Sequence, residues 1–83
     1  MDNSRYADFV TRRRRLNERL DSLGRDVDEW IEGYNGTPSM SVLATLEGLL
    51  TERRLLLTRL AELDESFVQY LVTLRNELQP LAD

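Results

Sequence analysis

The residues with the most obvious chemical potential are four consecutive arginines, Arg12, Arg13, Arg14 and Arg15. Guanidinium groups bind phosphates and carboxylates, so this run could contact nucleic acid or an acidic protein segment. On a helix, however, successive side chains are ~100° apart, so the run encircles the axis instead of forming one basic face. With a net charge of −4, the pattern favours ion pairing with acidic residues across the molecule, and nucleic-acid or acidic-partner binding is the alternative hypothesis.

The sequence lacks the residue types that most catalytic and metal sites require. It contains no Cys and no His, and all eleven basic residues are Arg. Thiolate and imidazole chemistry, zinc fingers and lysine Schiff bases are therefore excluded. We accordingly expect no catalytic residue, no metal, no cofactor and no small-molecule substrate, and hence a protein that is not an enzyme.

Apolar residues recur at alternating spacings of three and four along two segments of the chain. This 3.5-residue period is typical of the seam of a coiled coil. The expected seam of the first segment contains Tyr6, Phe9, Leu16, Leu20, Leu23, Val27 and Trp30, and that of the second contains Leu43, Leu46, Leu50, Leu57, Leu60, Phe67, Leu71, Leu74, Leu78 and Leu81.

These two segments predict an all-α fold, a single antiparallel helical hairpin that spans residues 1–83 and resembles a coiled coil. We expect helices over 4–33 and 38–79, joined by a turn over 34–37 that contains Asn35 and Gly36. A Thr-Pro pair suits the start of the second helix, and Pro80 is expected to end it.

The two seams also predict which residues lie opposite each other in the hairpin. Because the connection is short, the helices must be antiparallel neighbours, and one register places every seam position of one helix against a seam position of the other. The expected pairs include Trp30 with Leu43, Leu16 with Leu57, Arg13 with Leu60, Phe9 with Asp64 and Tyr6 with Phe67.

Three charged residues, Arg13, Arg53 and Asp64, interrupt the apolar seams. A buried unpaired charge costs several kcal/mol, so each should find a partner or extend into solvent. Arg13 and Arg53 beside Glu52 are similar to the arginines with which small all-helical chorismate mutases hold a dianionic substrate between helices. That resemblance would imply an enzyme with a closed polar pocket, but the chain lacks Lys.

The second helix has more apolar surface than the first can cover. Residues beside its expected seam are apolar, and its last part extends beyond the level at which the first helix ends. Burying one leucine contributes roughly 1.5–3 kcal/mol, so we predict that a homodimer, most simply an antiparallel four-helix bundle, or a docked partner helix covers them. The expected contact residues are Leu49, Leu56, Leu63, Tyr70, Leu71, Leu74, Leu78 and Leu81.

The segment from Trp30 to Gly33 resembles the Trp-x-Gly turn of the small helical-hairpin proteins exported by type VII secretion. Its Trp-to-Gly spacing is one residue longer, and the family's C-terminal Tyr-x-x-x-Asp/Glu signal is missing, because Leu74 follows Tyr70 at that spacing. The resemblance implies a secreted helical hairpin as a further alternative.

The sequence as a whole predicts a non-enzymatic helical module for protein–protein interaction, such as an adaptor, a small chaperone or a regulator. Its apolar runs are shorter than the ~20 residues needed to span a bilayer, and its first residues show no apolar signal-peptide core. We therefore expect a cytoplasmic protein that does not enter a membrane.

Overall fold

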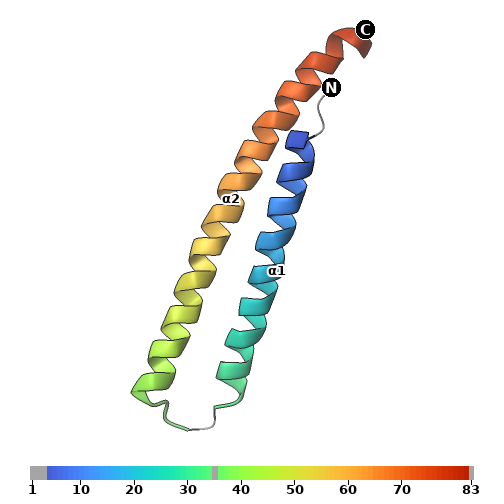
Figure 1. Cartoon of the computed structure of the whole chain (residues 1–83). Helices are drawn as coiled ribbons and strands as arrows, with labels where there is room; N and C mark the ends of the chain where they lie inside the picture. Colours follow the sequence, from blue (N-terminus) through green and yellow to red (C-terminus); the bar gives the residue numbers. More distant parts are fainter. Residues whose placement is uncertain (1–3, 35, 83) are drawn as a thin grey trace.

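The computed structural model describes residues 4–34 and 36–82, apart from the side chains of 80–82. The described chain consists of two helices, α1 (Ser4–Glu32) and α2 (Met40–Ala82). They lie side by side as an antiparallel hairpin with extents of 66 × 17 × 15 Å (Figure 1). The all-α hairpin predicted from the alternating spacing is therefore confirmed.

The connection between the helices contains the predicted turn but is longer at both ends. The N–H of Gly33 donates to the carbonyl of Glu29 at 2.9 Å just past the end of α1, and Gly36 has a φ of +132°, which favours glycine. Ser39 caps α2, because its Oγ accepts the N–H of Val42 at 3.3 Å. The predicted start at residue 38 is therefore two residues early.

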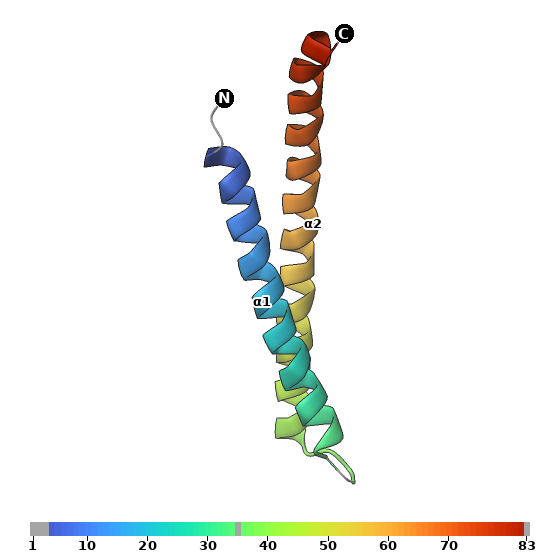
Figure 2. The ribbon, with the colours of Figure 1, turned by 90° about the vertical axis from the view of Figure 1, so that its right-hand side faces the viewer.

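The second helix also ends later than predicted. It continues through Pro80 to Ala82, whereas the sequence predicted an end at Gln79. A proline this close to a C-terminus removes one backbone hydrogen bond from a turn whose carbonyls mostly lack helical partners. Figures 1 and 2 show that this part of α2 extends past the N-terminal end of α1.

The core of the hairpin is narrow and lies along one face of each helix. Phe9, Leu23 and Val27 of α1 are buried, and Leu56 of α2 is the least exposed apolar side chain at 4%. The predicted seam residue next to it, Leu57, is 40% exposed. We define the inner seam of α2 as its buried and half-buried apolar residues, Val42, Leu46, Leu49, Leu56, Leu60, Leu63, Phe67, Tyr70 and Leu74.

An aromatic cluster joins the helices where the N-terminal part of α1 meets α2. The Phe9 ring lies 4.9 Å from that of Phe67 in an edge-on arrangement and 5.8 Å from that of Tyr70. The Tyr6 and Phe67 rings, a predicted pair, are 5.5 Å apart, and the Arg5 guanidinium lies 4.8 Å above Tyr70. Such contacts add roughly 0.5–1.5 kcal/mol per aromatic pair to the burial of apolar area.

Two side chains at this end of the hairpin make contacts that the predicted pairs did not include. Phe9 contacts the rings of Phe67 and Tyr70. Nε of Arg13 donates to Oδ1 of Asp64 at 2.9 Å, one turn beyond its predicted partner Leu60. Aromatic side chains gain more from contact with each other than with a carboxylate, and the long Arg13 side chain reaches the carboxylate one turn away.

Two glycines of this fold should respond in opposite ways to replacement by alanine. A Cβ added at Gly48, inside α2, meets no atom within 4 Å, whereas a Cβ at Gly33 would lie 2.8 Å from the backbone oxygen of Glu29. We expect Gly48→Ala to raise the free energy of unfolding by ~0.5–1 kcal/mol, because alanine is the better helix former. Gly33→Ala should lower it; thermal unfolding followed by circular dichroism measures both, and equal shifts would contradict the described turn.

Candidate interaction surface

A row of exposed leucines runs the length of α2 beside the inner seam. We call it the outer stripe: Leu43, Leu50, Leu57, Leu71 and Leu78, which recur every seven residues with Asp64 in the remaining place. Their side chains are all 40–47% exposed. Four of the five directly follow a residue of the inner seam, so the stripe is rotated by ~100° about the helix axis from the face that contacts α1.

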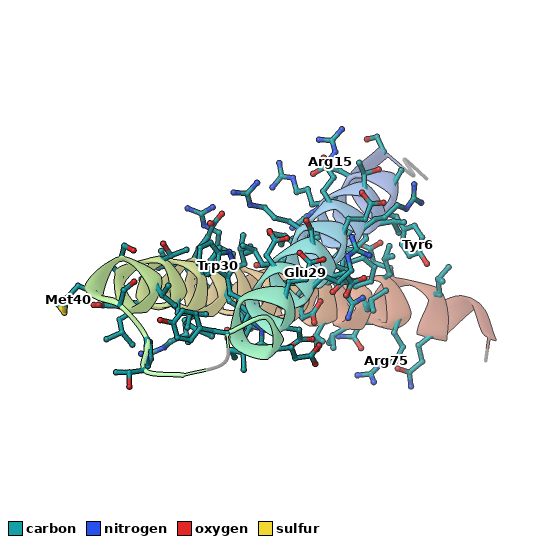
Figure 3. The ribbon with its side chains drawn as sticks, turned by 90° about the horizontal axis from the view of Figure 1, so that it is seen from below. Tyr6, Arg15, Glu29, Trp30, Met40 and Arg75 are labelled. Atoms are coloured by element: carbon teal, nitrogen blue, oxygen red, sulfur yellow. The ribbon has the colours of Figure 1, made fainter. Side chains whose placement is uncertain are left out.

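Further residues beside the outer stripe extend it away from α1. Met40, Ala61 and Val68 precede stripe positions by three residues and are exposed. The same row contains three charged residues, Glu47, Arg54 and Arg75, which are also exposed. Figure 3 shows the side chains of Met40 and Arg75 directed away from α1. The outer stripe with this row forms an apolar face that carries isolated charges, and we call it the stripe face.

A shallow open groove between the helices continues the stripe face onto α1. Asn17 and Asp21 line two neighbouring stretches of it, one beside Val68 and the other beside Leu57. The α1 wall also includes Val10 at one end and Gly24 further along. Longer charged side chains line the same wall, so the groove is mainly polar along α1.

The opposite flank of the hairpin is polar. Arg19 of α1 and Glu52 of α2 form an ion pair there. Near it, Arg59 and Ser66 line a groove together with Arg12. Over the described residues the hairpin thus has two unlike flanks, a mainly apolar stripe face and a polar flank opposite it.

The arginine run is divided between ion pairs and solvent. Nε of Arg12 lies 3.0 Å from Oδ2 of Asp8 within α1, and Nε of Arg13 lies 2.9 Å from Oδ1 of Asp64 across the hairpin. Arg14 and Arg15 are exposed, and Arg15 lines the groove on the polar flank together with Arg12. Each of these pairs is more than a third exposed, so it contributes only ~0–1 kcal/mol.

Half of the predicted contact residues lie elsewhere than expected. Leu56 is buried against α1, and Leu49, Leu63 and Tyr70 are half-buried in the same inner seam, so this set packs inside the hairpin and does not flank it. Leu71 and Leu78 are exposed on the outer stripe, and Leu74 is half-buried. Leu81 belongs to α2, but its side chain lies outside the described residues.

The sequence predicted the outer stripe to be buried and part of the inner seam to be exposed, because either set forms a 3-4 pattern with the same intervening residues. Leu46, Leu60, Phe67 and Leu74 complete a 3-4 pattern with either set, so spacing alone does not distinguish them. One signal was present in the sequence: the predicted seam contains Asp64, where the observed seam has Leu63. The cost of burying a carboxylate favours the set with leucine at this level.

The two arginines considered for substrate binding do not share one pocket. Arg13 lines one stretch of the groove between the helices, together with Asp64, and Arg53 lines the other. Both arginines are exposed. Within residues 4–34 and 36–82, no three acidic side chains are grouped so that they could hold a metal ion.

Comparison with protein-family models, with curated proteins and with solved structures gives no match to this chain. Neither helix, over its described residues, has a stretch long and apolar enough to cross a membrane. The function is therefore inferred from the stripe face and its residues.

The assignment of the inner seam can be tested with two adjacent leucines. Leu56 is 4% exposed, whereas Leu55 is 57% exposed on the side of α2 away from the stripe face. We expect Leu56→Ala to lower the free energy of unfolding by ~2–3 kcal/mol and Leu55→Ala to change it by less than about 0.5 kcal/mol. Urea denaturation at one fixed protein concentration measures both, and similar losses would show that α2 is rotated differently about its axis.

Proposed function

We propose that this protein is a non-enzymatic interaction module that binds helices through the stripe face of α2. The observation that carries the proposal is the outer stripe, whose five leucines recur every seven residues and are each about half exposed. A heptad repeat of leucine is the pattern with which one helix packs against another. Soluble proteins rarely leave such a contiguous apolar surface in water unless it binds something.

The exposed area of the hairpin supports the same proposal. The chain exposes 6666 Å², whereas a compact monomer of 9.7 kDa exposes only about 5,100 Å². The difference of about 1,500 Å² exceeds the ~800 Å² that each partner buries in a standard interface. Adaptor, small-chaperone and regulator roles all follow from a surface that accepts a helix, and both self-association and docking of a foreign helix would use it.

The C-terminal part of α2, which extends past α1, is an accessible part of this face. Leu71 and Leu78 belong to the outer stripe in this part, and Val72 beside them is exposed. A partner helix that contacts this end would not need to displace α1. We therefore expect it to tolerate substitutions that remove binding without unfolding the hairpin.

The alternative of nucleic-acid binding has less support from the geometry. Arg12 and Arg13 are engaged with Asp8 and Asp64, and Arg15 lies on the polar flank, where Glu62 lines the same groove. No basic stripe comparable in length to the row of leucines results from this arrangement.

Replacing two stripe leucines by glutamate should abolish helix binding. In the Leu71→Glu/Leu78→Glu variant, charges replace the apolar contacts. The tagged variant should therefore capture at least about tenfold less of each protein that the tagged wild type captures, untagged copies of this chain included. Affinity capture from the native cell with quantitative mass spectrometry measures this loss.

The matched control is Gln69→Glu/Asn76→Glu, which adds the same charge at the same spacing on an exposed side of α2 away from the stripe face. It should capture the same set of proteins as the wild type. Equal capture by all three baits, with equal helix content by circular dichroism, would refute the proposed function.

A further inference from the structure

We infer that the occupant of the stripe face is a second copy of this chain, with α2 packed antiparallel on α2 so that Arg54 of each copy lies opposite Asp64 of the other. This inference rests on the proposed function and names the partner of the same surface. It follows from the order of charges along the stripe face, from the apolar residues that this order brings together, and from the angle between the two apolar faces of α2.

The charges on the stripe face alternate in sign along α2. Glu47, Arg54, Asp64 and Arg75 read negative, positive, negative, positive from the N-terminal to the C-terminal end. Reversing a second copy gives the complementary order, so Arg54 of each copy can face Asp64 of the other, while Glu47 and Arg75 come within about one turn of each other. A parallel pair would place each charge next to the same charge, which costs free energy at every level.

The register that joins Arg54 to Asp64 also matches the apolar residues. At its centre Leu57 faces Ala61 of the second copy, and the small alanine lets the helices approach closely. Leu50 then faces Val68, and Leu78 faces Met40 near the ends of the contact. Leu71 faces Glu47 of the second copy, and Arg75, one turn from Leu71 on the first copy, can pair with that carboxylate.

Shifting the second copy by one heptad in either direction removes this agreement. One shift places Asp64 opposite Glu47 and Leu57 opposite Arg54. That shift also shortens the overlap of the helices. The other places Leu50 opposite Arg75 and Leu71 opposite Arg54. Polar residues within an apolar stripe fix register in this way in coiled coils.

The ion pair that Asp64 already makes is compatible with a second one. Arg13 of the same chain donates to Oδ1 of Asp64, and the Asp64 side chain stays 42% exposed. A carboxylate offers two oxygens with about four acceptor sites, so it can accept two guanidinium groups. Asp64 would then bridge Arg13 of its own hairpin and Arg54 of the second copy.

The two apolar faces of α2 have the geometry of a helix at the corner of a four-helix bundle. The outer stripe follows the inner seam by one residue, which corresponds to ~100° around the helix. A helix in a square bundle contacts two neighbours at about a right angle. Here α1 is one neighbour, and α2 of the second copy is the other.

The test is a pair of charge reversals, Arg54→Glu and Asp64→Arg, mixed in equal amounts. Alone, each variant brings like charges together twice, so its homodimer should be about tenfold weaker than that of the wild type. In the mixed dimer the two substituted positions face each other with opposite charges, and the unchanged Arg54 of one chain faces the unchanged Asp64 of the other, so both pairs are restored. The variants differ in mass, so native mass spectrometry counts each species, and we expect mixed dimers to exceed the half that random pairing gives.

The control variant is Arg59→Glu, which makes the same charge reversal on the polar flank of α2 and is used in place of Arg54→Glu. Mixed with Asp64→Arg, it should give no excess of mixed dimers. Circular dichroism confirms that each variant remains helical.

Two results would contradict the inference but would leave the proposed function intact. A wild-type protein that remains monomeric at high micromolar concentration in ultracentrifugation excludes a second copy, while capture that depends on the stripe face can still hold. Wild-type dimers with no excess of mixed dimers in the charge-reversal mixture exclude this antiparallel register.

Discussion

The structure depends on one constraint: α1 is a single helix and can cover only one side of α2. The apolar surface of α2 is wider than that, because two heptad rows of leucine lie one residue apart along it. A helix about 10 Å in diameter buries one such row and leaves the other in water. The narrow core, the exposed leucines and the large accessible area of this small chain all follow from that mismatch in width.

The sequence predicts the fold because the 3-4 spacing and the Gly-rich connection leave little choice beyond an antiparallel hairpin. It predicts the Tyr6–Phe67 contact for the same reason. The sequence does not decide which row of α2 packs against α1, because either row forms a 3-4 pattern with the same residues, Leu46, Leu60, Phe67 and Leu74. That choice depends on small free-energy differences between burying one row and burying the other. Burying Leu63 costs less than burying Asp64, and the observed rotation of α2 also brings Phe67 and Tyr70 into contact with Phe9.

The candidate surface was predictable to a similar extent. The excess apolar width of α2 and its extension beyond α1 were visible in the sequence, and Leu71 and Leu78 are exposed as that reasoning requires. Exchanging the rows misplaced Leu49, Leu56, Leu63 and Tyr70, since each is the neighbour in sequence of an outer-stripe position. A rotation of one residue interchanges inside and outside in a helix, just as a one-residue slip does in a strand.

The charges on the stripe face differ physically from those inside a core. In the isolated hairpin Arg54 and Arg75 are exposed, so they cost almost nothing there and their order is free of any folding requirement. A second helix against this face would desolvate them in part, and the cost would then depend on what they meet. Leucines with isolated charges therefore combine two properties: the apolar side chains supply affinity for any helix, and the charges reject helices and registers that do not complement them.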